Sequence, residues 1–248
     1  MLKKSILFTT LVCSVFAGDI KIALAANVSY AIEDLKKEFH KLYPDTRVKV
    51  TLSGSGKLTA QIKYGAPYQL FMSANMKYPE ALYADKIAVT KPVIYAQGSL
   101  AYFSIKKHDF SRGMELLEDK KISKIAIVNP KTAPYGKAAF EAMENSNILN
   151  NIKHKFIYGE SISQAVSYAV TAADIGLIAK SSLYSIHMTK YKKGINWGAV
   201  DSKLYTPIDQ GIVILKEGKD SAEVRAFYDF ILSPQARAIF ERFGYIVP

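Results

Sequence analysis

Short apolar strands and amphipathic helices alternate along almost the entire chain, and this order restricts the fold more than any other feature. Residues 20–25 form a compact apolar run typical of a buried strand, and residues 29–41 place their apolar side chains on one face of a helix. This alternation predicts an α/β fold in which parallel sheets carry helices on both faces. The other predicted strands are 48–52, 70–72, 100–105, 125–128, 155–158, 175–179 and 211–215, and the other predicted helices are 58–64, 79–85, 114–118, 136–144, 162–172, 222–232 and 235–243.

The N-terminal segment differs from the rest of the chain. A short positive start is followed by an apolar run that is too short to span a bilayer, and Ala17 suits signal cleavage. These features predict a secretory signal peptide over residues 1–17. Its removal also removes Cys13, the only cysteine, so we expect no disulfide in the exported protein.

The remaining chain is long for one open sheet, which predicts two lobes. Residues 95–98 and 206–209 are the best candidates for the connections between the lobes. We therefore expect residues 18–96 and 208–248 to form the first lobe and residues 97–207 to form the second. Ligands of such sheets bind beyond the carboxyl ends of the strands, so a ligand is expected in the cleft between the lobes.

A loop of serine and glycine at residues 53–56 separates a predicted strand from a predicted helix. Backbone N–H groups at a helix start have no partner within the helix, so they can converge on an anion together with a serine hydroxyl. A second strand end of this kind, Ala-Ala-Asn at residues 25–27, lies earlier in the chain. Two uncharged helix starts that face one cleft predict a binding site for a small anion.

Motifs of enzyme chemistry are missing from the sequence. The four histidines have no metal-ligand spacing. Lys57 is followed by Leu58 instead of a hydroxyl residue, which excludes a nucleotide P-loop. Ser55 lacks the flanking glycines of a nucleophile elbow. We therefore expect no enzyme, and the alternative from another class, a secreted α/β hydrolase, would need a nucleophile–base pair.

The formal net charge of +11 comes from lysines that are scattered along the chain. Lysine doublets on turns and helix faces are typical of a solvated surface, whereas a nucleic-acid surface would need them clustered with aromatic side chains. We therefore expect no nucleic-acid partner, although a positive field would help to steer an anion.

Several motifs of the chain are those of a known family, and they lie at residues 25–32, 61–67, 70–75, 129–136 and 227–240. With these motifs the chain resembles the periplasmic molybdate-binding proteins of ABC importers over essentially its whole length after the signal peptide. The resemblance implies a type II periplasmic binding fold with the ligand cleft between two α/β lobes. It also implies a monomeric periplasmic protein that binds molybdate without a cofactor and passes it to an inner-membrane permease. Tungstate is nearly the same size as molybdate, so we expect both to bind.

The resemblance further implies which residues bind the oxyanion. Asn27 corresponds to the family's first ligand serine and Ser55 to its second, and the backbone N–H groups of Tyr135 and Ile162 supply the donors from the middle of the chain. The metal would be held only through its oxygens. Asn27 offers an amide donor and a backbone N–H, but it could instead serve only as a helix cap. Ser55 could likewise be an ordinary turn serine, and the other two could be ordinary helix starts.

Ala179 departs from the family pattern, because relatives often supply a tyrosine hydroxyl at this position. The chain either loses this donor or replaces it, and Lys180, Ser181 and Tyr158 are candidates that the sequence does not rank. Gln69 stands where relatives commonly have aspartate, and we expect a structural role for it. Within transport, the alternative is a receptor for sulfate, which shares the charge and shape of molybdate. A ferric site would need anionic oxygen ligands that the two loops do not provide.

Overall fold

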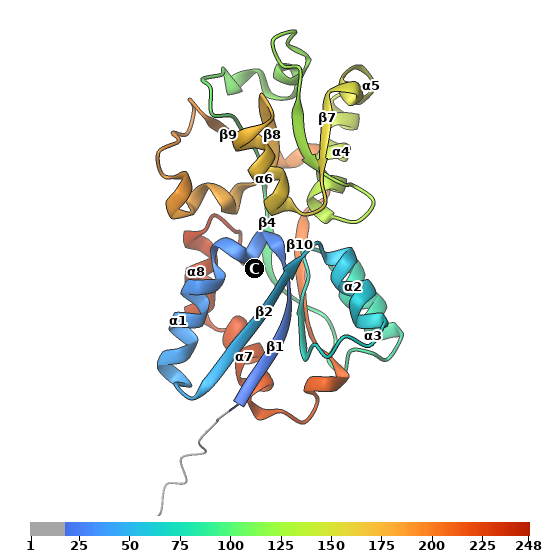
Figure 1. The fold of residues 1–248 in the computed structure, drawn as a ribbon, viewed down its shortest axis with the longest axis vertical. Helices are drawn as coiled ribbons and strands as arrows, with labels where there is room; N and C mark the ends of the chain where they lie inside the picture. Colours follow the sequence, from blue (N-terminus) through green and yellow to red (C-terminus); the bar gives the residue numbers. More distant parts are fainter. Residues whose placement is uncertain (1–17) are drawn as a thin grey trace, which may run out of the picture.

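The computed structural model describes residues 18–248 and folds them into two α/β lobes, which lie one above the other in Figure 1. The predicted signal peptide lies outside the described residues. Each lobe contains a five-stranded sheet with helices packed against it. The two-lobed α/β fold predicted from the sequence is thereby confirmed.

The first lobe, at the bottom of Figure 1, contains both ends of the described chain. Its strands are β1 (Gly18–Ala25), β2 (Thr46–Ser53), β3 (Leu70–Met72), β4 (Val93–Gly98) and β10 (Ile208–Ile214). Its helices are α1 (Ile32–Leu42), α2 (Ser55–Lys63), α3 (Lys77–Ala84), α7 (Ala222–Ile231) and α8 (Pro234–Arg242), with the 3-10 turns η1 (Ala26–Tyr30) and η7 (Lys216–Gly218). The sheet has the order β2-β1-β3-β10-β4, and β10 runs antiparallel to both of its neighbours.

The second lobe is built from the middle of the chain. Its strands are β5 (Leu100–Phe103), β6 (Ile125–Val128), β7 (Phe156–Gly159), β8 (Ile175–Ala179) and β9 (Trp197–Ala199). Its helices are α4 (Pro134–Asn145), α5 (Leu149–Ile152) and α6 (Ile162–Thr171), with the 3-10 turns η2 (Phe110–Glu118), η3 (Lys153–Lys155), η4 (Lys180–Tyr184), η5 (Ile186–Met188) and η6 (Ser202–Leu204). The sheet has the order β7-β6-β8-β5-β9, and β5 runs antiparallel to β8 and β9.

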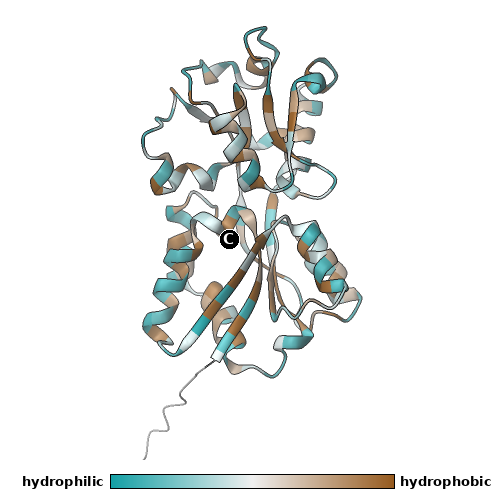
Figure 2. Ribbon diagram, viewed as in Figure 1, coloured by the Kyte–Doolittle hydropathy of each residue, from teal (hydrophilic) through white to brown (hydrophobic). Residues whose placement is uncertain are grey.

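Alternate side chains of each central strand face opposite sides of its sheet, as the two-residue period of a strand requires. In β1, Ile22 and Leu24 belong to the core formed with α1, α7 and α8, whereas Ala23 faces the smaller core under α2 and α3. In β6, Ile125 and Ile127 pack with α4 on one face. Figure 2 shows the resulting pattern, with apolar strands inside and polar helix surfaces outside. Several helices begin just after a strand ends, and several of these helix starts lie at the junction of the lobes.

The expectation of parallel sheets is wrong, because both sheets are mixed. Residues 95–98, predicted as a connection, belong to β4. Gly98 disfavours a strand by propensity and Gln97 is not among the residues that favour one, but tertiary contacts decide their conformation. The backbone of Gln97 pairs with Asp209 on β10 and exchanges two hydrogen bonds with Ile246, at 2.7 and 3.0 Å.

Smaller elements also differ from the prediction. The short elements β9 and α5 were not expected from the sequence. The helix predicted at 114–118 is part of η2, a pair of 3-10 turns interrupted at Gly113, whose φ of 58° is left-handed. Among residues 18–248, the structure contains no helix that is long and apolar enough to cross a membrane.

The chain passes from the first sheet to the second through a single residue. β4 ends at Gly98 and β5 begins at Leu100, so only Ser99 lies between them. The return path to β10 runs through residues 200–207. Gln97 and Gly98, assigned to the second lobe from the sequence, pair with β10 in the first sheet. The residue boundaries given for the lobes otherwise stay a prediction.

Asp174, in the turn before β8, forms hydrogen bonds with two other loops of the second lobe, one that contains Lys106 and one that contains Ser123 and Lys124. Its Oδ2 accepts hydrogen bonds from the Ser123 N–H (2.9 Å), the Ser123 hydroxyl (2.9 Å) and the Lys124 N–H (3.1 Å). Burial raises the pKa of Asp174, but these bonds and that from Lys106 outweigh it and hold the pKa at about 2. Because the folded pKa lies below the ordinary value of 3.8, Asp174 stabilises the fold above about pH 4, and this contribution is lost as the pH falls toward 2.

We expect Asp174→Asn to lower the free energy of unfolding at pH 7 by about 1–2 kcal/mol, because it removes a charge from several hydrogen bonds. The difference from wild type should shrink as the pH falls from 4 toward 2. Urea unfolding at pH 7 and at pH 3 measures both effects. The matched control is Asp45→Asn on an exposed turn, which should change stability by less than about 0.5 kcal/mol. An equal effect of both variants at pH 7 would contradict the prediction.

Candidate functional site

A small pocket with a cavity volume of about 10 Å³ lies at the junction of the two lobes. Pockets that hold drug-sized molecules measure roughly 300–1,000 Å³, so this one has no room for such a molecule. Its lining comes from both lobes and consists of Ala25, Ala26, Asn27, Ser53, Gly54, Ser55, Ala74, Ala133, Pro134, Tyr135 and Ile162. None of these described residues carries a formal charge at neutral pH. The pocket brings together Asn27, Ser55, Tyr135 and Ile162, whereas Ala179 and Lys180 are not part of its lining.

Ser55 is the first residue of α2 and follows Gly54, whose backbone is extended. The predicted helix at 58–64 therefore begins three residues earlier than expected and includes the serine. The Ser55 side chain is buried, and its Oγ accepts a hydrogen bond from the Ala74 N–H at 3.0 Å. Because that bond occupies a lone pair, the hydroxyl proton of Ser55 stays available to an acceptor in the pocket.

Three helices of eight or more residues begin at the pocket, and each has backbone N–H groups that no carbonyl of its own helix can accept. Ser55, Tyr135 and Ile162 lie in the first turns of α2, α4 and α6. Within residues 18–248, none of their backbone N–H groups donates to a protein atom. At α6 the Ser161 hydroxyl accepts from the Gln164 N–H at 3.3 Å, which leaves the Ile162 N–H free. The positive ends of three helices thus face one pocket.

Asn27 lies in η1, directly after β1, and is 1% exposed. Its Nδ2 donates to Gln210 Oε1 at 2.8 Å and to Tyr245 Oη at 3.0 Å, so the side chain does not act as a helix cap. Its backbone carbonyl accepts from the Tyr245 hydroxyl at 2.8 Å. Asn27 Oδ1 is buried and finds no partner in the described part of the chain. An unpaired buried acceptor costs about 1–3 kcal/mol.

A buried polar network that sequence reasoning did not find lies around Asn27. Gln210, on β10, is fully buried, accepts from the Tyr95 hydroxyl at 2.8 Å and donates to the Tyr135 hydroxyl at 3.4 Å. Burial raises the pKa values of the Tyr95, Tyr135 and Tyr245 hydroxyls above their ordinary value, so these groups stay neutral at physiological pH. The sequence carries no clear signal for this network, because Gln210 stands in the Asp-Gln-Gly stretch that precedes the apolar residues of β10.

The candidates for the hydroxyl that Ala179 does not supply have other positions. The Ser181 hydroxyl donates to the Asn27 carbonyl at 3.1 Å. The Lys180 N–H donates to the Ser99 carbonyl at 2.8 Å. Tyr158, on the edge strand β7, is 49% exposed. None of the three lines the pocket, whereas the buried Tyr245 hydroxyl lies beside Asn27.

The two glycines of the loop at residues 53–56 allow the lobes to approach each other. The Gly56 N–H donates to the carbonyl of Thr132 in the second lobe at 3.1 Å, and the Tyr78 hydroxyl donates to the same carbonyl at 3.4 Å. A Cβ at Gly56 would lie 2.8 Å from that carbonyl oxygen and 2.8 Å from the Tyr78 hydroxyl. A Cβ at Gly54 would lie 3.2 Å from the Glu160 carbonyl. The glycines are therefore explained by close packing between lobes, not by backbone conformation.

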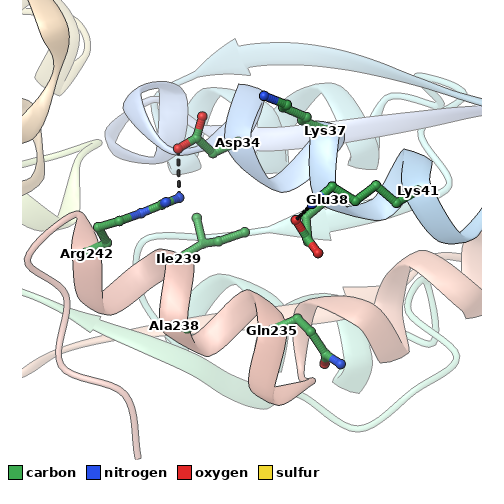
Figure 3. A pocket seen from close by; sticks show the side chains of 8 residues that line it. All are labelled: Asp34, Lys37, Glu38, Lys41, Gln235, Ala238, Ile239 and Arg242. Atoms are coloured by element: carbon green, nitrogen blue, oxygen red, sulfur yellow. Dashed lines mark hydrogen bonds and ion pairs between the residues drawn. The ribbon is translucent and has the colours of Figure 1, made fainter.

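A larger and more open hollow lies on the outside of the first lobe, between α1 and α8 (Figure 3). Four of its charged side chains form pairs, Arg242 with Asp34 at 2.8 Å and Lys41 with Glu38 at 2.6 Å. Lys37 is the only charged side chain of this lining without such a pair, so no set of free donors converges there. In the described range 18–248, no group of three His, Cys, Asp or Glu side chains could hold a metal ion. The pocket at which α2, α4 and α6 begin is the candidate functional site, because the free backbone N–H groups converge there.

Comparison with known proteins agrees with this architecture. A profile of bacterial extracellular solute-binding proteins matches residues 20–246. The molybdate-binding protein ModA of Azotobacter vinelandii is 33% identical over 239 residues, which cover 95% of this chain and 92% of that protein. ModA of Rhodobacter capsulatus is 33% identical over 233 residues, which cover 93% and 89% of the two chains.

Solved structures lead to the same fold. The periplasmic molybdate-binding protein of Azotobacter vinelandii superposes with a TM-score of 0.84 at 30% identity, covering 92% of this chain and 99% of the other. The sulfate-binding protein SubI of Mycobacterium tuberculosis has a TM-score of 0.72 at 14% identity, which shows a shared fold alone; the match covers 92% and 86% of the two chains. Two lobes around a small pocket define a ligand-binding protein. The chain belongs to the family of bacterial extracellular solute-binding proteins, which is not a family of enzymes.

We expect Gly56→Ala to weaken anion binding by at least about tenfold, since the added methyl group would keep the Thr132 carbonyl and the lobes apart. Calorimetric titration with molybdate, the ligand named for the relatives above, measures the change. Gly65→Ala is the matched control, because Gly65 has a φ of 85° and no atom within 4 Å of its Cβ position. That variant should lose about 1 kcal/mol of stability through backbone strain but keep its affinity. Wild-type affinity in Gly56→Ala would show that binding does not need this contact.

Proposed function

We propose that this protein captures molybdate in the periplasm and delivers it to the permease of an ABC transporter. One observation carries the proposal. The Ser55 hydroxyl and the unpaired backbone N–H groups of Ser55, Tyr135 and Ile162 line one small pocket that has no charged side chain. The names of the two ModA relatives support molybdate as the ligand.

Uncharged donors can hold a dianion without a buried lysine or arginine. A hydrogen bond to a charged group contributes about 1.5–3 kcal/mol, and each helix N-terminus adds about 0.3–1 kcal/mol. Several such bonds can offset the cost of removing the anion from water and of bringing the lobes together. We expect the remainder to be about −10 to −12 kcal/mol, which corresponds to a nanomolar dissociation constant.

The donor set also determines which anions are rejected. The free backbone N–H groups at the pocket offer no acceptor to the O–H of a protonated oxyanion such as hydrogen phosphate, for which Asn27 Oδ1 is the one free amide acceptor. Sulfate carries the same charge and shape as molybdate and can be excluded only by the size of the cavity. Tungstate is nearly the same size as molybdate and should bind with it.

Hydrogen bonds across the junction support a mechanism in which the anion stabilises the closed form. The Gly56 N–H contacts the Thr132 carbonyl, and the Ser163 hydroxyl of α6 donates to the Ala26 carbonyl at 3.0 Å. The anion adds donors from both lobes to these contacts. The closed form is then the one that docks on the permease, which releases the anion inward.

Isothermal titration with molybdate, tungstate, sulfate and phosphate tests the proposed ligand. We expect heat from molybdate and tungstate with nanomolar dissociation constants, at least about a hundredfold weaker binding of sulfate, and no binding of phosphate. Heat from sulfate without heat from molybdate would contradict the proposal and indicate a sulfate receptor instead.

Ser55→Ala should weaken molybdate binding by at least about tenfold, because it removes a hydrogen bond to a charged ligand. Ser221→Ala is the matched control. Ser221 caps α7, where its hydroxyl accepts from the Val224 N–H at 3.2 Å, outside the pocket. That variant should lose about 1 kcal/mol of stability without any loss of affinity. Unchanged affinity in Ser55→Ala would remove this side chain from the site.

The affinity for molybdate should change by less than about threefold between pH 6.5 and pH 9, because no group at the pocket titrates there. The only ionisable side chain in the lining is Tyr135, and burial raises the pKa of its hydroxyl well above the ordinary value of 10.0. Titrations at several pH values in this range measure the profile. A steep loss of affinity toward high pH would show that a cationic group takes part in binding.

A further inference from the structure

The Asn27 Oδ1 is the one fully buried polar side-chain atom of the pocket lining that finds no partner among the described residues. The Nδ2 of the same amide is directed to Gln210 and Tyr245. Oδ1 therefore points away from both of them. An acceptor in this place opposes an anion, whereas the free backbone N–H groups of the pocket are donors. This conflict between an acceptor and an anionic ligand rests on the proposed function. The neighbouring amide of Gln210 can resolve it.

We propose that Gln210 is a positioning residue that sets the orientation of the Asn27 amide, and that the two amides turn over together when the anion binds. In the arrangement described above, Gln210 Oε1 accepts from Asn27 Nδ2 and from the Tyr95 hydroxyl, both at 2.8 Å. Gln210 Nε2 donates to the Tyr135 hydroxyl at 3.4 Å. An amide that turns by half a rotation exchanges its donor and its acceptor at unchanged positions.

After both amides turn, each group on the protein side keeps a partner. Gln210 Nε2 then donates to Asn27 Oδ1 and to the Tyr95 hydroxyl. The Tyr95 proton turns to the Ser73 carbonyl, which already lies 3.4 Å from the Tyr95 oxygen. Gln210 Oε1 accepts from the Tyr135 hydroxyl in place of donating to it.

The bonds around the Asn27 backbone also survive the turn. Before the turn, the Asn27 carbonyl accepts from two hydroxyls, those of Tyr245 at 2.8 Å and Ser181 at 3.1 Å. When Asn27 Oδ1 takes the position 3.0 Å from the Tyr245 oxygen, the Tyr245 proton can move to it. The Ser181 hydroxyl still satisfies the carbonyl. The turned network therefore leaves only Asn27 Nδ2 without an acceptor, and this donor faces the pocket.

The amide pair thus has two arrangements that match two contents of the pocket. With Oδ1 toward the pocket, the side chain is satisfied by a donor such as water. With Nδ2 toward the pocket, it is satisfied only by an acceptor, and an unprotonated oxyanion presents nothing else. Gln210 makes the second arrangement available because, once turned, it presents a donor to Asn27 Oδ1 instead of a repelling acceptor.

Gln210→Glu tests this coupling, because a carboxylate accepts from Asn27 Nδ2 but cannot donate to Asn27 Oδ1. Gln235→Glu is the charge-matched control, since Gln235 is exposed on α8 and lies outside the pocket. In molybdate titrations at pH 7.5, we expect Gln210→Glu to raise the dissociation constant by at least about thirtyfold and Gln235→Glu by less than about threefold. Thermal unfolding of the ligand-free proteins checks that both variants fold.

Nuclear magnetic resonance on the wild-type protein tests the turn without a substitution. In the ligand-free protein, the Gln210 side-chain amide protons should show contacts to the Tyr135 ring. With molybdate bound, these contacts should move to the Tyr95 ring, and the Asn27 amide protons should shift downfield and become protected from solvent exchange. A purely structural Gln210 would show the same neighbours in both states.

The outcomes separate this inference from the proposed function. No binding of molybdate, tungstate or sulfate by the wild-type protein would overturn both. Binding by the wild type with equal affinities in Gln210→Glu and Gln235→Glu would overturn the role of Gln210 and leave the proposed function standing. Contacts of the Gln210 amide that do not change with molybdate would overturn the turn itself.

Discussion

The structure depends on one property of the α-helix, which is that the backbone N–H groups of its first turn cannot be paired within the helix. In most helices, water or a cap satisfies these groups. Here α2, α4 and α6 begin at one buried junction, where their first N–H groups are shielded from bulk water and have no protein acceptor within residues 18–248. The strand ends position these helix starts, the glycines allow the two lobes to approach each other, and the polar network around Asn27 lies beside the pocket.

The lobes reach this geometry through contacts that tolerate little added volume. Gly54 and Gly56 bring α2 against backbone carbonyls of the other lobe. Gly98, at the end of β4, leaves room for the Tyr135 hydroxyl, with which a Cβ at that position would collide. Each of these glycines has a role in the approach of one lobe to the other. The Tyr135 side chain therefore joins the start of α4 to the buried amide of Gln210 in the first lobe.

Much of the fold and part of the candidate site could be predicted from local sequence signals. The alternation of strands and helices indicated the two α/β lobes, and the serine–glycine loop indicated a helix start near Ser55, although the helix was predicted to begin three residues too late. The direction of β10 and the strand character of Gln97 and Gly98 could not be predicted, because they follow from pairing with distant segments. The network of Asn27, Gln210 and Tyr245 joins residues that are about two hundred positions apart in the sequence, and no local pattern records such a contact.

The discontinuous first sheet restricts the order in which the protein can be completed during synthesis. All strands of the second sheet lie within residues 100–199, so this lobe has its full set before β10 is made. The first sheet must wait for β10, which separates β3 from β4, and the network around Asn27 must wait for Tyr245. A growing chain therefore carries an unfinished first lobe until residue 245 has been released. Removal of Tyr245 and the residues after it would affect the surroundings of Asn27 before it affected the second lobe.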